Sequence, residues 1–167
     1  SIFKMNLLNS ILFFGILIVN TFNAQESNAK NQENIDFPKV LSYRSASCGC
    51  CKKWVNHLRD NGLKVVDNII EDISDIKKQY NVPNNLISCH SAKIGNYMIE
   101  GHVPIESINK LFKEKPSISG IAVPGMPHGS PGMETHSHES LSHNYETYKV
   151  ISFSNNGNTK IFDQISP

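Results

Sequence analysis

Apolar residues recur along the chain with the period of a helix in some segments and of a strand in others. Trp54 and Leu58 share one helical stripe, which predicts a helix that ends at the Asn-Gly pair 61–62. A short helix is predicted to be capped by Ser74, and another to open at Pro104. The predicted strands are 38–43, 64–70, 86–91, 97–100, 148–153 and 159–162, with one more at the start of 119–133.

The order of these elements is βαβ, then a short helix, then ββα, which is the arrangement of a thioredoxin-like domain. The sequence therefore predicts an α/β fold of the thioredoxin-like (βαβ-ββα) type over residues 37–167. An added loop, rich in Met, His, Pro and Gly, occupies 119–133. A C-terminal β-hairpin is predicted to turn at the Asn-Gly pair 156–157.

The N-terminal residues differ from this domain. An apolar run at 7–19 follows Lys4 and is shorter than the roughly 20 residues that a membrane-spanning helix needs. We predict a signal peptide over 1–25, with an uncleaved anchor as the alternative. Residues 26–36 are polar and predict a linker. The mature protein is thus expected to be periplasmic or otherwise exported, and free of the membrane after signal cleavage.

The charge of the chain excludes one class of partner, and its length indicates a single domain. The net charge is +1 and aromatic residues make up 8% of the chain, so no basic face is predicted and nucleic acid is excluded as a partner. The domain after the linker has about 130 residues, within the usual size of one domain with its own core.

Three of the four cysteines lie in the stretch Ser47-Cys48-Gly49-Cys50-Cys51, at a predicted strand-to-helix turn. Cys48 and Cys51 have the spacing that lets two thiols meet in one disulfide or at one metal ion. The positive end of the helix dipole, with two lysines beside it, favours thiolates there. Cys50 projects about 100° from Cys51 around the helix, so sulfurs that bridge several ions fit better than three sulfurs on one ion.

Disulfides are the first alternative, because secreted chains with several cysteines are often cross-linked. The possible pairings are 48–51 with 50–89, 48–50 with 51–89, and 48–89 with 50–51. Each contains one bridge that closes a very short loop and removes little unfolded-state entropy. A purely structural role for all four cysteines is therefore disfavoured.

The remaining cysteine, Cys89, precedes the third predicted strand. In a thioredoxin-like layout this loop lies against the turn after the first strand, so Cys89 and His90 are expected to face the cysteine turn. His90 is a candidate ligand, or a base that helps to ionise a thiol, with a solvent-exposed histidine as the alternative. For His102 we predict a structural role, and for Trp54 and His57 packing and surface roles.

The loop at 119–133 carries Met126, His128 and Met133 between prolines and glycines. A thioether in such a loop is a good soft ligand for Cu(I), although both methionines could instead pack the loop onto the domain. His136, His138 and His143 follow in a polar segment and are weaker candidates for metal binding.

Five motifs together resemble the CopG-like family of bacterial copper-resistance proteins, long catalogued as a domain of unknown function. The resemblance covers essentially the whole mature domain. The motifs are Ser47-Cys48-Gly49-Cys50-Cys51 with Trp54, then Val82-Pro83, and the segments 88–92, 97–104 and 122–134.

This resemblance implies a thioredoxin-like fold, export, and copper bound by Cys48, Cys50, Cys51 and Cys89 in a cysteine-bridged cluster of more than one Cu(I). The loop residues Met126, His128 and Met133 match the family's loop. Copper ions are the implied partner, with another copper-handling envelope protein as a candidate for delivery.

The main alternative function is a thiol-disulfide oxidoreductase that uses Cys48 and Cys51, because one scaffold can host both activities. A zinc site fits less well, since structural zinc prefers two separated ligand pairs around one ion. The sequence leaves open whether the protein turns over as an enzyme, and whether the copper changes its oxidation state.

Overall fold

The structure is a computed structural model that describes residues 35–134 and 145–167. These residues form a mixed α/β fold with one seven-stranded sheet. The strands are β1 (Val40–Arg44), β2 (Val65–Ile69), β3 (Ser91–Ile94), β4 (Tyr97–Glu100), β5 (Gly120–Ala122), β6 (Tyr148–Phe153) and β7 (Thr159–Ile165). The helices are α1 (Gly49–Asp60), α2 (Ser74–Gln79) and α3 (Ile105–Glu114), with a 3-10 turn η1 at Asn84–Leu86.

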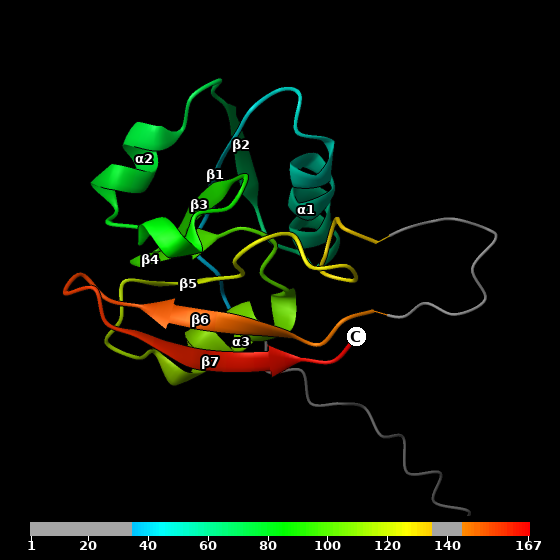
Figure 1. The fold of residues 1–167 in the computed structure, drawn as a ribbon. Helices are drawn as coiled ribbons and strands as arrows, with labels where there is room; N and C mark the ends of the chain where they lie inside the picture. Colours follow the sequence, from blue (N-terminus) through cyan, green and yellow to red (C-terminus); the bar gives the residue numbers. More distant parts are fainter. Residues whose placement is uncertain (1–34, 135–144) are drawn as a thin grey trace, which may run out of the picture. The chain divides into compact units, whose positions relative to one another are not determined.

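The sheet has the strand order β2-β1-β3-β4-β5-β6-β7 (Figure 1). β1 is parallel to β2 and antiparallel to β3, and β4 is antiparallel to β3 and parallel to β5. The last two strands form an antiparallel hairpin that continues the sheet beyond β5.

Successive residues of a strand point to opposite sides of the sheet, and apolar side chains on each side pack into a core of their own. Ile99 and Ile121 face a large core that contains the buried stripes of α1 and α3. Their neighbours Met98 and Ala122 face a smaller core that contains residues of η1, with α2 packed against it.

The elements largely follow the sequence pattern, with three differences. The strand predicted at 86–91 is wrong, because Leu86 ends η1, residues 87–90 form a loop, and β3 begins only at Ser91. Ser74 is the first residue of α2 rather than its cap, and its backbone N–H donates to the carboxylate of Asp72. β7 runs on to Ile165, beyond the predicted end at residue 162.

The predicted signal peptide at 1–25 and almost all of the linker lie outside the described residues. Within the described part, no helix has the length and apolar character needed to cross a bilayer.

Strand directions bring several loops to one end of the sheet. Tyr43 near the end of β1 pairs with Ser91 at the start of β3, and Ser91 pairs with Glu100 at the end of β4. Because β5 is parallel to β4, Ala122 at its end lies beside Glu100. The cysteine turn, the Cys89 loop, His102 and the loop after β5 must therefore meet at this end.

Candidate metal centre

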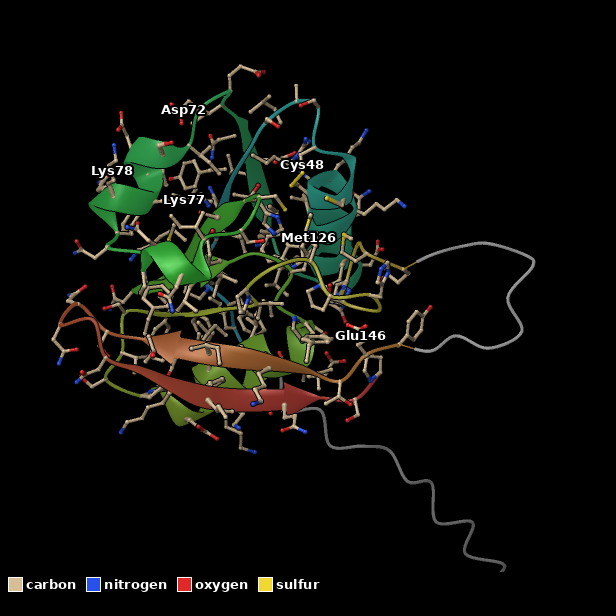
Figure 2. All side chains as sticks on the ribbon, in the orientation of Figure 1. Cys48, Asp72, Lys77, Lys78, Met126 and Glu146 are labelled. Carbon is tan, nitrogen blue, oxygen red and sulfur yellow. A yellow bond between two sulfur atoms is a disulfide. The ribbon has the colours of Figure 1, made fainter. Side chains whose placement is uncertain are left out.

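The cysteine turn leads directly into α1. Cys48, labelled at the start of α1 in Figure 2, is the N-cap residue, and its carbonyl accepts a hydrogen bond from the backbone N–H of Lys52. No acidic residue lies in the first turn of the helix, so its positive dipole end is uncompensated from within the helix. Cys51 is fully buried, whereas Cys48 and Cys50 are half-buried. The sulfurs thus lie at the edge of the core.

All four cysteines gather in one place. Their sulfurs lie within 4.8 Å of one another, so the predicted approach of Cys89 to the cysteine turn is seen in the structure. Cys48 and Cys51 form a disulfide, and Cys50 and Cys89 are free. The Sγ atoms of Cys48 and Cys50 are 3.5 Å apart. A free thiol pair beside one disulfide differs from each of the fully paired alternatives.

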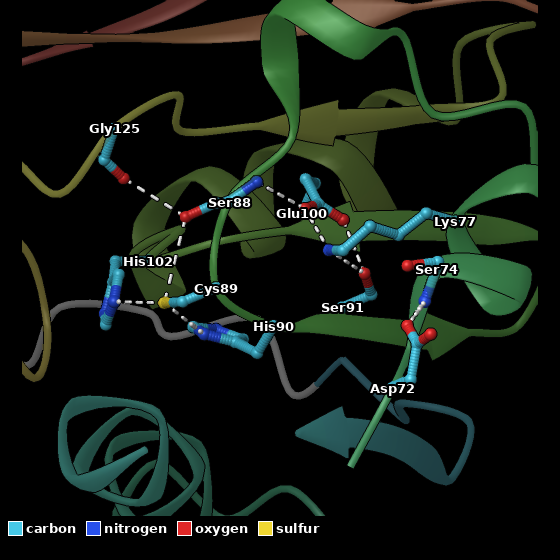
Figure 3. Close-up of polar contacts among 10 residues, drawn as sticks. All are labelled: Asp72, Ser74, Lys77, Ser88, Cys89, His90, Ser91, Glu100, His102 and Gly125. Atoms are coloured by element: carbon cyan, nitrogen blue, oxygen red, sulfur yellow. Dashed lines mark hydrogen bonds and ion pairs between the residues drawn. The ribbon is translucent and has the colours of Figure 1, made fainter. Parts of the chain in front are cut away.

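Two histidine rings approach the Cys89 sulfur (Figure 3). His90 Nδ1 is 3.4 Å from the Sγ of Cys89, and His102 Nε2 is 3.3 Å from it. The structural role predicted for His102 is therefore incomplete, because its ring contacts a candidate ligand directly. Cys89, His90 and His102 form a second group whose donor atoms all lie within 4.8 Å of one another.

A hydrogen bond to Pro131 determines which nitrogen of His102 carries the proton. Its Nδ1 is 2.8 Å from the carbonyl oxygen of Pro131, which can only accept a hydrogen bond. A neutral ring must therefore be protonated at Nδ1 and carry a lone pair on Nε2. That lone pair faces the sulfur of Cys89, where it can accept the thiol proton or coordinate a metal ion.

His90 is buried between aromatic neighbours, with its ring centroid 4.5 Å from that of Trp54. Burial, followed by the electrostatic influence of His102 and Lys77, holds the pKa of His90 well below its usual range. Among the described residues, its Nε2 is the buried side-chain nitrogen that has no hydrogen-bond partner. A neutral imidazole suits a metal ligand, and the nitrogen of His90 that lies beside the Cys89 sulfur is Nδ1.

The Cys89 thiol is protonated near neutral pH in the metal-free protein. Burial, reinforced by the charge of Cys50, raises its pKa to about 11. Because a thiol must lose its proton to bind a metal ion, binding at Cys89 releases a proton.

The loop after β5 divides into two halves. Ser130, Pro131 and Gly132 are buried, whereas Met126 is 52% exposed and His128 is also exposed. Met133 is half-buried. Neither His128 nor a methionine is placed among the sulfurs by a described contact, and His136, His138 and His143 lie outside the described residues.

Gly132 packs this loop against the cysteine helix. Its φ is +91°, and a Cβ built on it would lie 2.6 Å from the carbonyl oxygen of Cys50 and 3.0 Å from the amide nitrogen of Trp54. A larger residue would therefore push the loop, and with it Pro131, away from α1.

Gly132→Ala is expected to be more destabilising than Gly157→Ala. Both positions have left-handed backbones, for which alanine costs about 1–2 kcal/mol. Only Gly132 adds a backbone clash, because a Cβ at Gly157 would meet nothing within 4 Å. We expect about 1–3 kcal/mol more for Gly132→Ala. Denaturant unfolding of both variants measures this difference. Equal losses of unfolding free energy would mean that the loop moves away from α1 without a cost.

Sequence reasoning missed one buried group beside these ligands. Lys77 and Glu100 are an ion pair in the interior, although their positions in the sequence resemble those of ordinary surface charges. The one sequence feature that could have indicated this buried pair is the position of Glu100, which ends a predicted strand at the end of the sheet where the ligands gather.

The chain was compared with known proteins. A family model described as "Protein of unknown function, DUF411" matches residues 86–133. Two solved structures are named copper resistance protein CopG, form 2 and form 1. They are 38% and 37% identical to this chain, cover 77% and 78% of it and 99% of their own chains, and both have a TM-score of 0.69. No curated protein matched.

Proposed function

The chain belongs to the same family as the copper resistance protein CopG, and on this premise we propose that it is an exported copper-binding protein of copper resistance. The observation that carries the proposal is the gathering of four sulfurs from two separate loops within 4.8 Å. Soft thiolates are good ligands for Cu(I). With four sulfurs so close, bridging thiolates can hold more than one ion.

The proposed ligand set has a sulfur part and an imidazole part. Cys48, Cys50, Cys51 and Cys89 supply the thiolates. His90, through Nδ1, and His102, through Nε2, supply neutral nitrogens beside Cys89. The exposed Met126 and His128, with Met133, would be outer ligands that copper meets first.

We propose a thioredoxin-like core for this chain. Support comes from the strand order β2-β1-β3-β4, with α1 and α3 against one face and α2 against the other. The cysteine turn after β1 would then occupy the position of a redox dithiol. Export by the signal peptide at 1–25 belongs to the same proposal.

The second candidate function is thiol-disulfide exchange, and the Cys48–Cys51 disulfide favours it. An exchanger cycles between this disulfide and the dithiol. For the copper proposal the same bond has another consequence. Two of the four sulfurs are withheld while it is intact, so reduction must precede full copper loading.

We therefore expect the reduced protein to bind more than one Cu(I) per chain and to prefer Cu(I) to Zn(II). Anaerobic titration against a chromophoric Cu(I) chelator measures the stoichiometry and the affinity. The matched control is the same protein with the Cys48–Cys51 disulfide left intact, which should bind fewer ions because it offers only two thiols.

Two results would contradict this function. One is a limit of one ion per reduced chain, which excludes a bridged cluster. The other is readier loading with Zn(II) than with Cu(I), which would indicate a borderline site rather than a soft one.

A further inference from the structure

A closed network of buried polar groups lies behind the Cys89 loop (Figure 3). Lys77 Nζ donates to Glu100 Oε1 at 2.5 Å and to the hydroxyl of Ser91 at 2.9 Å. That hydroxyl donates to Glu100 Oε2 at 2.5 Å. The backbone N–H of Ser88 donates to Glu100 Oε1 at 2.6 Å. Lys77 comes from α2, whereas the other groups lie in β3, in β4 and in the loop before β3.

This network lies deep in the interior. Glu100 and Ser91 are fully buried, and Lys77 is 6% exposed. A buried ion pair is weak evidence for stability by itself, because the desolvation of two charges offsets their attraction. The presence of this ion pair calls for another explanation, and buried polar groups are best known for specifying one arrangement of the chain.

The carboxylate bonds to both sides of the ligand pair. Ser88 and Ser91 immediately flank Cys89 and His90 in the sequence, and each is held by Glu100. The carbonyl of His90 accepts a hydrogen bond from the backbone N–H of Gly101, the residue after Glu100. The segment that carries two candidate ligands is thus fixed at its start, within it and at its end.

We propose that Glu100, neutralised by Lys77, is a positioning residue that holds Cys89 and His90 against the cysteine turn. The purpose of this positioning rests on the proposed function, because ligands that are already in place favour the binding of a metal ion. It predicts that the acceptor oxygens of Glu100 matter for ligand placement and that the ion pair serves to keep the carboxylate in the interior.

A cross-linking test measures this placement without copper. In a Cys48→Ser/Cys51→Ser background, only Cys50 and Cys89 remain as thiols, and their sulfurs lie within 4.8 Å of each other in the parent structure. Diamide oxidises the pair to one disulfide and takes up the two electrons and two protons that the thiols release. The rate of disulfide formation then reports how well Cys89 is held beside Cys50.

Two double variants separate positioning from stability. Lys77→Met/Glu100→Leu removes both charges and every acceptor, whereas Lys77→Met/Glu100→Gln keeps an acceptor oxygen for the Ser88 N–H. We expect the Leu variant to cross-link at least about 10-fold more slowly, because misplacement of reacting groups by about 1 Å can cost on the order of 100-fold. The cross-linking rate of the Gln variant should remain within about threefold of the background rate, a much smaller change than misplacement of the reacting groups would cause.

Asp163→Asn is the matched control. The carboxylate of Asp163 also bonds to a serine hydroxyl and pairs with a lysine, but these partners are Ser107 and Lys110 of α3, away from the sulfurs. Its cross-linking rate should equal that of the background. All rates are measured at a temperature at which circular dichroism shows every variant folded.

If the Leu variant does not fold, Ser91→Ala replaces it, because this change removes one contact of Glu100 and leaves the ion pair. It should slow cross-linking in the same direction. Cross-linking at the background rate in a folded Leu variant, or in Ser91→Ala, would overturn the proposal and leave the network as an anchor for α2. A Gln variant as slow as the Leu variant would also overturn it, since acceptor oxygens would not be what matters.

Copper titration of the same changes, made in the chain with all four cysteines, gives a second readout. The Leu variant should lose about 10- to 100-fold in Cu(I) affinity, as is typical when a partner of a ligand is removed. If the parent binds no copper, the proposed function fails, while the cross-linking rates still decide whether Glu100 positions Cys89.

Discussion

Replacing Cys50 or Cys89 by serine is expected to reduce copper loading steeply, and by more than the share of one sulfur in four. In a bridged cluster each thiolate links two ions, so the loss of one sulfur removes more than one metal–ligand bond. The sulfurs of all four cysteines lie within 4.8 Å of one another, which permits such sharing. A serine hydroxyl is a hard, neutral donor that Cu(I) does not accept as a replacement.

The measurement is copper per chain after anaerobic loading and desalting, taken together with the rate at which each variant reduces a disulfide substrate. A dithiol exchanger attacks with one thiolate of the Cys48–Cys51 pair and resolves with the other, and needs neither Cys50 nor Cys89. Full copper loading in Cys50→Ser and Cys89→Ser, with a strong reductase rate that disappears only in Cys48→Ser or Cys51→Ser, would make the protein an oxidoreductase.

The gathering of the cysteines could be predicted from the sequence because it depends on element order. Once the chain is interpreted as βαβ followed by ββα, the loop that contains Cys89 must lie beside the turn that contains Cys48. Which face of the sheet each strand residue covers was not predicted, and adjacent apolar residues of one strand, such as Met98 and Ile99, pack into different cores.

Other parts could not be predicted because they depend on tertiary contacts. The apolar residues Leu86 and Ile87 suggested a strand, but Leu86 packs in the smaller core as part of η1. Lys77 lies among charged and polar residues of α2, and only the position of Glu100 in space explains why its side chain points inward. The sequence likewise contains no sign that Pro131 would determine the tautomer of His102.

The prediction for His102 follows from that tautomer. Its protonated Nδ1 faces Pro131, and its Nε2 lone pair faces the sulfur of Cys89 at 3.3 Å. If the ring is a ligand, His102→Ala removes a donor from the centre and should lower Cu(I) affinity by at least about 10-fold, the lower end of losses seen when only a ligand's partner is removed. The same change also frees the loop at Pro131 and should lower stability.

His57→Ala is the control that separates these two effects. His57 Nε2 accepts a hydrogen bond from the backbone N–H of Ile105, so its loss also removes a histidine-to-backbone bond, but no sulfur is involved. We expect both variants to unfold at lower denaturant concentration and only His102→Ala to lose copper affinity in competition with a Cu(I) chelator. Parent-like affinity in a folded, destabilised His102→Ala would contradict a ligand role and support the structural role that the sequence predicted. The lone pair on Nε2 would then only accept the thiol proton of Cys89.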